Sequence, residues 1–148
     1  MEIKITKIDP RAVIPTYGTP GSAAFDLTAI EDTTIQPNEQ VLIRTGLVFG
    51  IPPGHVQLVF SRSSSFKKFG FILSNGVGII DSDYCGPEDE LFIAAMNPGP
   101  EPLQINAGSR VAQSLILPYP KISFVEGAAD GPNRGNFGST GGHGDVSV

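Results

Sequence analysis

The sequence predicts an all-β fold of one domain, a sandwich or barrel-like jelly roll. Three observations support this prediction. The chain has 148 residues, which suits a single domain. Its 18 glycines and 13 prolines are spread along the whole length and divide it into short segments. These segments are rich in Val, Ile, Leu and Phe, and many short strands between Gly and Pro turns are typical of sandwiches and jelly rolls.

The expected strands are apolar segments that are too short for most helices. Several alternate with a period of two, as Ile3 and Ile5 do against Glu2 and Lys4, which indicates a strand with one buried face. The segments expected as strands are residues 3–8, 40–51, 55–60, 70–75, 90–97 and 110–119.

One short helix is expected within residues 62–70, RSSSFKKFG. A serine can cap its start, Lys67 and Lys68 suit the C-terminal end of the helix dipole, and Gly70 can close it. Such a helix has only about two turns and depends on packing for its stability.

The character of the chain changes near its C-terminal end. We expect residues 1–126 to form the β domain and residues 127–148 to form a flexible, Gly-rich tail. Composition alone favours plain disorder there. However, Phe137 stands beside Gly-Ser-Thr-Gly with Arg134 three positions earlier, a combination that favours a function for the tail.

Composition also limits the possible partners. Charged residues are only 17% of the chain, which is typical of a protein that hides part of its surface in an oligomer. The net charge is −5 and no Lys/Arg run occurs, so we expect no nucleic-acid partner. No secretory or membrane-length apolar segment is seen, which predicts a cytoplasmic chain without a membrane partner. The single cysteine, Cys85, excludes an internal disulfide.

Residues 74–86, SNGVGIIDSDYCG, hold the first candidate for chemistry, because an apolar run ends there in Asp81 and Asp83. The spacing half-matches a calcium loop, but Cys85 and Phe92 stand where that loop needs oxygen ligands. Two interpretations remain. The carboxylates form a β-turn with nearby backbone groups, or one of them acts as a base or binds a metal-bound water at a strand end.

Two further segments carry groups suited to phosphate. Residues 60–66 place Arg62 and a run of serines between an expected strand and the expected helix, where N–H groups and a guanidinium fork can bind phosphate oxygens. Plain helix capping with a surface arginine explains the same residues equally well. Residues 108–113 place Arg110 and Gln113 at a strand start, which alone indicates only a turn and a strand.

Five segments form an ordered set along the chain. They are GSAAFDLTA (21–29), SRSSS (61–65), NGVGIIDSDYCG (75–86), GSRVAQ (108–113) and RGNFGSTG (134–141). In this order they resemble the five motifs of the trimeric deoxyuridine triphosphatases, the dUTPases. The third segment is the most specific, and the resemblance runs from about residue 4 to residue 141.

The resemblance implies a β-clip jelly roll that assembles into a homotrimer, with sites shared between subunits. It implies hydrolysis of dUTP to dUMP and diphosphate, by in-line attack of water at the α-phosphorus, with Mg²⁺ as cofactor. Such a reaction keeps uracil out of DNA and supplies dUMP for thymidylate synthesis.

The resemblance implies that the third motif supplies the catalytic base and recognises the sugar and the uracil. Asp81 is expected to orient and activate the attacking water. Tyr84 is expected to pack under the deoxyribose and leave no room for a ribose 2′-OH. Asn75 and the backbone through Val77 are expected to read the uracil edge from an apolar hairpin that ends at Asp81.

The resemblance implies that the first, second and fourth motifs bind the phosphates and the metal. Arg62, Ser63, Ser64 and Gln113 are expected to hold the phosphate chain. Mg²⁺ is expected to bind mainly the phosphate oxygens, with Asp26 holding its water ligands, because this ion keeps several waters.

The tail is expected to close over the substrate as a lid. Phe137 would stack on uracil, and Arg134, Ser139 and Thr140 would contact the γ-phosphate. The sequence departs from the family here, since Arg134 lies closer to Phe137 than the usual Arg-Gly-x-Gly-Gly-Phe spacing allows, and its reach to the γ-phosphate is open.

The sequence departs from the family at two other places. Ser109 stands where the fourth motif usually has Asp, and residues 87–90, PEDE, resemble a short insertion.

Two alternatives to a dUTPase stay open at this point. One is a dCTP deaminase-like or bifunctional enzyme on the same fold, although that family usually has Asp-Pro-Gly-Phe where this chain has Asp-Ser-Asp-Tyr. The other is a non-catalytic β module that binds a nucleotide or a partner.

Overall fold

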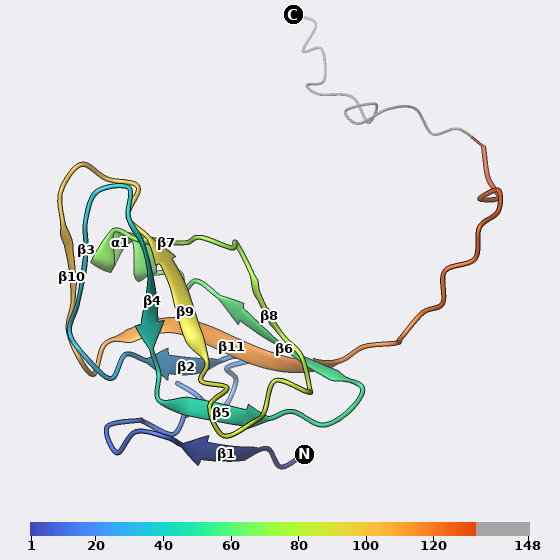
Figure 1. Cartoon of the computed structure of the whole chain (residues 1–148), viewed down its shortest axis with the longest axis horizontal. Helices are drawn as coiled ribbons and strands as arrows, with labels where there is room; N and C mark the ends of the chain where they lie inside the picture. The colour runs from blue at the N-terminus through green and yellow to red at the C-terminus, as the bar shows by residue number, and fades with distance from the viewer. Residues whose placement is uncertain (133–148) are drawn as a thin grey trace, which may run out of the picture.

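The computed structural model of the chain describes residues 1–132 (Figure 1). This part of the chain contains eleven β-strands and one α-helix, which confirms the prediction of an all-β fold with one short helix. Every strand pairing is antiparallel.

The strands form two larger sheets and two ribbons. The largest sheet has the order β2 (Phe25–Thr28), β11 (Arg110–Pro118), β6 (His55–Phe60) and β8 (Gly78–Ile80). The second has the order β4 (Gln40–Arg44), β9 (Phe92–Met96) and β7 (Ile72–Leu73). The ribbons pair β1 (Lys4–Lys7) with β5 (Leu47–Gly50), and β3 (Thr33–Ile35) with β10 (Leu103–Ile105).

A single apolar core joins all four of these units. Strand alternation supplies it, as in β2, where Phe25 and Leu27 are buried while Asp26 points to the opposite face. Each buried large apolar side chain contributes about 1.5–3 kcal/mol. The largest fully buried apolar side chains are Phe71, Leu27, Ile35, Ile43, Leu47, Leu91, Ile93, Ile105 and Val111.

The prediction of one continuous strand over residues 40–51 was wrong. The chain breaks after Arg44 and forms β4 and β5 in two different units. Gly46 causes the break, because its φ of +68° lies in the left-handed region. A side chain would not fit there either, since a Cβ on Gly46 would lie 2.9 Å from the Cβ of Ala12.

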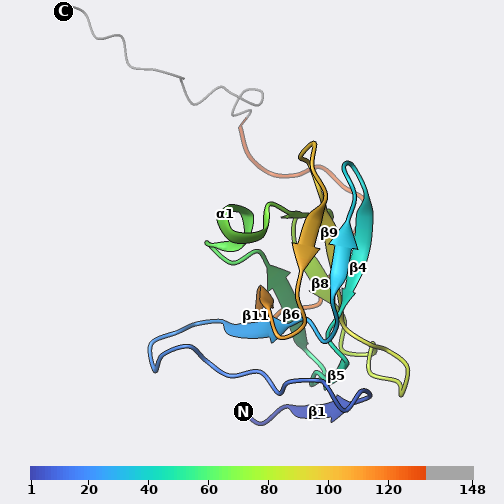
Figure 2. The same ribbon diagram turned by 90° about the vertical axis from the view of Figure 1, so that its left-hand side faces the viewer.

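The expected helix is present as α1 (Ser65–Phe69), with Lys67 and Lys68 in its last turn and Gly70 in the left-handed conformation after it. Figure 2 shows α1 at the edge of the molecule, where the chain leaves β6. The expected serine cap was wrong in detail, because Ser64 at the N-cap makes no side-chain capping bond. The hydroxyl of Ser65 accepts the Arg62 N–H at 3.2 Å instead and donates to the Val111 carbonyl at 3.3 Å.

The remaining expected strands are found, most of them shortened at their ends. Residues 70–75 contribute only the two residues of β7. The three-residue strands β3 and β10 were not predicted, and each is completed by pairing with the other across about 70 residues of sequence.

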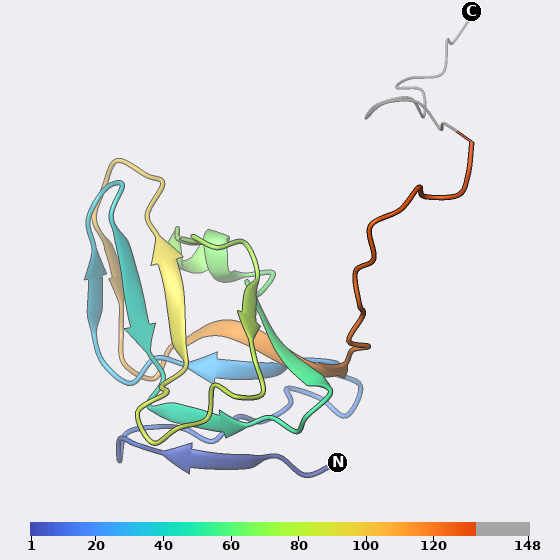
Figure 3. The same ribbon diagram turned by 45° about the vertical axis from the view of Figure 1, so that its right-hand side comes forward.

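The C-terminal end of the described chain leaves the strands after β11 (Figure 3). The N–H of Tyr119 still bonds to the Gly54 carbonyl at 2.9 Å, and residues 120–132 are exposed, without helix or strand. The predicted boundary at residue 126 stays a prediction. Within residues 1–132, no helix has the length and apolar character needed to span a membrane.

Candidate active site

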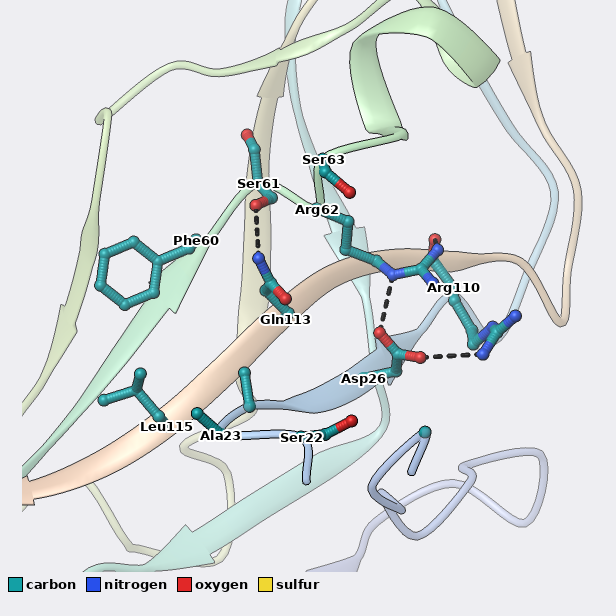
Figure 4. A pocket seen from close by; sticks show the side chains of 12 residues that line it. Ser22, Ala23, Asp26, Phe60, Ser61, Arg62, Ser63, Arg110, Gln113 and Leu115 are labelled. Atoms are coloured by element: carbon teal, nitrogen blue, oxygen red, sulfur yellow. Dashed lines mark hydrogen bonds and ion pairs between the residues drawn. The ribbon is translucent and has the colours of Figure 1, made fainter. Parts of the chain in front are cut away.

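An open pocket of about 660 Å³ lies on the face of the largest sheet that points away from the core (Figure 4). It brings together residues from three of the five motifs. Its lining residues are Gly18, Ser22, Ala23, Ala24, Asp26, Phe60, Ser61, Arg62, Ser63, Arg110, Gln113 and Leu115.

Asp26 lies at the centre of this pocket and binds two arginines. Its Oδ1 lies 2.7 Å from Nε of Arg62, and its Oδ2 lies 3.0 Å from Nη1 of Arg110 (Figure 4). The Asp26 and Arg62 side chains are each 19% exposed, so these charge-assisted bonds are partly shielded from water. The arginines are thereby held with their remaining N–H groups available to a ligand.

Arg62 is also tied to the fourth motif through the backbone, because its Nη1 donates to the Arg110 carbonyl at 3.2 Å. Its own N–H is held by Ser65, as described above. Ser63 lines the pocket as expected, whereas Ser64 is the N-cap residue of α1 and is not among the lining residues.

Gln113 is positioned by strand register. On β11 it pairs directly with Asp26 on β2 and with Phe60 on β6, so its side chain faces the same side of the sheet as the Asp26 carboxylate. Its Nε2 donates to the Ser61 carbonyl at 3.0 Å. The predicted phosphate residues Arg62, Ser63 and Gln113 are therefore brought together in one pocket.

The third motif lies elsewhere. The expected hairpin was wrong, because β7 pairs with β9 and β8 pairs with β6, so the link between β7 and β8 crosses from one sheet to the other. At its tip, the Val77 N–H donates to the Asn75 carbonyl at 2.8 Å around Gly76, whose φ is +69°.

Gly78 keeps the backbone close to its neighbours at this tip. A Cβ on Gly78 would lie 3.0 Å from the Cβ of Val59 and 3.6 Å from Nδ2 of Asn75. A side chain there would therefore crowd Val59 and make ordinary contact with Asn75. Asn75 and Val77 are exposed, as a role in reading a base requires.

Asp81 follows β8 and is exposed. Its carbonyl accepts the Tyr84 N–H at 3.2 Å, which closes a backbone turn, whereas a bond from the Asp81 or Asp83 carboxylate to this turn stays a prediction. The Tyr84 hydroxyl donates to the Glu90 carbonyl at 3.0 Å. Among the described residues that line the pocket, none belongs to the third motif.

Arg134, Phe137, Ser139 and Thr140 lie outside the described residues. Sequence reasoning named Asp26 and Arg62 but did not pair them, and it did not assign Arg110 to the site. The signal for Arg110 was its position in the fourth motif beside Gln113. The pairing of Asp26 with Arg110 spans 84 residues and depends on the register of β2 with β11.

The pocket is suited to a polyanion. Two guanidinium groups, a serine and a glutamine amide provide several donors to phosphate oxygens, and Asp26 supplies a carboxylate for a hydrated cation. Within residues 1–132, no group of three His, Cys, Asp or Glu side chains forms a ready-made metal site. The donor set thus fits a metal that arrives with the ligand and binds Asp26 through water.

The structure defines a class of protein: an all-β sandwich with a pocket suited to a polyanion on its outer face. Comparison with known proteins gives its family. The sequence pattern of the dUTPase family matches residues 10–141. The chain therefore belongs to the dUTPase family.

Similar proteins agree with this assignment. A Desulfitobacterium hafniense protein named deoxyuridine 5′-triphosphate nucleotidohydrolase is 40% identical in an alignment 147 positions long that covers 95% of each chain. A protein of the same name from Pseudomonas putida is 41% identical in an alignment 146 positions long that covers 92% of this chain and 95% of that one. The crystal structure of dUTPase from Streptococcus mutans superposes with a TM-score of 0.75 at 30% identity, over 84% of this chain and 100% of that one.

Proposed function

We propose that this protein is a dUTP diphosphatase, which hydrolyses dUTP to dUMP and diphosphate by in-line attack of water at the α-phosphorus. The observation that carries the proposal is the pocket in which Asp26, Arg62, Ser63 and Gln113 meet, because three separate motifs of the dUTPase family supply it. The guanidinium, hydroxyl and amide donors of this pocket are suited to the oxygens of a triphosphate.

In the free protein Asp26 pairs with both arginines and offsets one of their two positive charges. A bound triphosphate would compete for their free N–H groups, while Gln113 and Ser63 add neutral donors. Ser64 would contribute through its place at the start of α1 rather than as a lining side chain.

Mg²⁺ is part of the same proposal. Asp26 would accept hydrogen bonds from the water ligands of the ion, which would supply positive charge beside the phosphate chain. Asp26 can do so because each carboxylate oxygen has two lone pairs and each binds one arginine nitrogen here. A solved dUTPase of phage phi11 is described with a coordinated structural Mg(II) ion.

The third motif would supply the chemistry. Asp81 is exposed and ionisable, as a base that accepts a proton from water must be. Tyr84 would screen the sugar, and Asn75 with the backbone through Val77 would read the uracil. In the free chain the Val77 N–H is engaged by Asn75, so reading uracil through that N–H requires this turn bond to open.

A homotrimer with shared sites would bring the third motif to the pocket. Leu58, Leu115 and Ile79 are direct cross-strand partners on the pocket face of the sheet. Ile79 is 66% exposed and Leu117, two residues after Leu115, is 45% exposed. An apolar strip of this kind beside a polar pocket is suited to burial by another copy of the chain.

The tail residues Arg134, Phe137, Ser139 and Thr140 would close over the bound nucleotide. We expect a chain that ends before Gly131 to fold normally and to lose most of its activity. The melting temperature and the rate of diphosphate release check the two parts separately. Full activity of the truncated chain would contradict the lid.

The direct test is diphosphate release from dUTP with Mg²⁺, compared with dCTP, UTP and dTTP. We expect rapid release from dUTP and little from the others. Ammonia release from dCTP would identify the deaminase alternative instead, and tight binding of a dUTP analogue without turnover would identify a binding module. The cytoplasmic location predicted from the sequence belongs to the same proposal, and a chain with one cysteine is compatible with it.

A further inference from the structure

Residues 87–90, which by resemblance look like a short insertion, take no part in the candidate site. They form a closed turn, because the Gly86 N–H donates to Oδ2 of Asp89 at 2.6 Å and the Asp89 N–H donates to the Gly86 carbonyl at 3.1 Å. The turn ends at Glu90, whose carboxylate is bonded to the rest of the fold.

Glu90 is a buried carboxylate, only 4% exposed. Its Oε2 accepts hydrogen bonds from Nε and Nη2 of Arg44, at 3.1 and 3.0 Å. Its Oε1 accepts the Gly46 N–H at 2.7 Å. A buried carboxylate is costly unless its oxygens are paired in this way, so these bonds fix Glu90 to the break between β4 and β5.

Arg44 has other carboxylates nearby. Its Nη1 lies 3.8 Å from both Asp9 and Glu31. The hydrogen bonds to Glu90 are the main reason why the pKa of Arg44 is raised, and the guanidinium stays charged. Glu31 differs from Glu90 in two respects. Its side chain is 37% exposed, and it lies far along the chain from the third motif.

The backbone of Glu90 holds Tyr84. The Glu90 carbonyl accepts the Tyr84 hydroxyl at 3.0 Å, and the next residue, Leu91, donates its N–H to the Leu47 carbonyl at 2.8 Å. Tyr84 is 39% exposed, so neighbouring side chains confine its ring only in part. The far end of the ring is thus held by a residue that is itself fixed by Arg44 and Gly46.

We propose that Glu90 is a positioning residue for Tyr84: its buried carboxylate, clamped by Arg44 and Gly46, fixes the carbonyl that orients the Tyr84 ring against the sugar. This rests on the proposed function, in which the ring leaves no room for a ribose 2′-OH. A ring that can shift would admit the extra hydroxyl, so Glu90 would act on the choice of deoxyribose over ribose.

Glu90→Gln is the sharpest variant because it keeps the shape of the side chain while it removes the charge and replaces one acceptor oxygen with a donor. If the amide nitrogen takes the place of Oε2, it faces Nε and Nη2 of Arg44, and both of those bonds are lost. If it takes the place of Oε1, it faces the Gly46 N–H, and that bond is lost. Either way donors meet and the clamp is weakened. Glu31→Gln is the matched control, since it removes a carboxylate from the same arginine without touching the loop.

The first measurement is kcat/KM for dUTP divided by kcat/KM for UTP. We expect Glu90→Gln to lower this ratio roughly five- to tenfold, the range expected for the loss of one hydrogen bond. Glu31→Gln should leave the ratio unchanged. Tyr84→Phe keeps the ring but removes the hydroxyl, and should lower the ratio by a similar factor. The double variant should have the same ratio as the single variants, because both changes act on the same contact between Tyr84 and Glu90.

Equal loss of activity towards both nucleotides in Glu90→Gln, or additive effects in the double variant, would overturn the proposal. Tyr84→Phe keeps the test decisive if Glu90→Gln does not fold. Amide hydrogen exchange of residues 81–86 gives a readout without substrate: faster exchange in Glu90→Gln than in Glu31→Gln supports the clamp, and equal exchange overturns it. A wild-type protein inactive on dUTP would refute the proposed function, while the exchange comparison would still decide the clamp.

Discussion

The pocket and the third motif are built in opposite ways. The pocket is assembled from β2, β6 and β11, strands far apart in the sequence, and its polar groups hold one another through Asp26. The third motif is one continuous stretch: β8 within it pairs with β6, and its other residues are held by short-range turns and by the contact of Tyr84 with Glu90. The proposed phosphate site is thus organised within one chain, whereas the proposed base is presented outward.

This difference explains how a small protein can both bind and select a nucleotide. A rigid sheet fixes charged donors well, because each residue's direction follows from strand register. Selection among bases and sugars needs close backbone approach, which the glycines of the third motif permit. Joining the two regions in one site is the task we assign to the trimer.

The largest expected effect on activity is that of replacing Asp81, which tests the chemical step and not the binding of the nucleotide. Asp81→Asn should lower kcat for dUTP by about 10²–10⁴, because a positioned base contributes that much to proton transfer. The exposed position of Asp81 predicts an unchanged melting temperature. Diphosphate release and thermal unfolding check the two parts, and wild-type turnover by this variant would remove Asp81 from the mechanism.

The next experiment asks whether the two regions meet across subunits. Asp81→Asn and Arg62→Ala should each be nearly inactive alone, since one lacks the base and the other a phosphate ligand. If sites are shared, unfolding and refolding the two variants together should restore much of the activity, because mixed trimers contain sites with both residues intact. A mixture as inactive as its components would place the complete site within one chain.

Asp26 tests the centre of the pocket. Asp26→Asn should raise the Mg²⁺ concentration needed for half-maximal activity by about 10- to 100-fold, the usual effect of losing a group that acts through a metal's water ligands. It also frees Arg62 and Arg110 from their shared carboxylate. Titration of activity with Mg²⁺ measures the shift. An unchanged midpoint would limit Asp26 to holding the arginines.

The smallest expected effect lies outside both regions, in the ion pairs behind the third motif. The Arg11 guanidinium bonded to Asp9 holds the pKa of that carboxyl far below its usual value. A lowered pKa in the folded state contributes stability above the unfolded pKa of about 4, and this contribution is lost as the pH falls below it. Asp9→Asn should therefore lower the melting temperature slightly at pH 7, with the difference shrinking below about pH 4. A difference that is constant down to low pH would contradict this account.

Local patterns predicted much of the fold. The Gly and Pro spacing and the two-residue alternation located most strands, and Gly70 with Lys67 and Lys68 located the helix, because these signals act over a few residues. The pairing of β3 with β10 left no such signal, since each strand is only three residues long. The break at Gly46 was missed because short apolar runs, residues 41–43 and 47–49, lie on both sides of the break and together look like one long strand.

The sequence by itself determined the family, the residues of each motif and their order, since these depend on residue type and spacing alone. Tertiary structure alone decided which of them meet. Asp26 binds Arg62 and Arg110 only because β2, β11 and β6 are neighbours, and Glu90 holds Tyr84 only because the break between β4 and β5 presents Arg44 and Gly46 to it. Contacts between residues 36 to 84 positions apart follow from strand order and register, which no local stretch of sequence encodes.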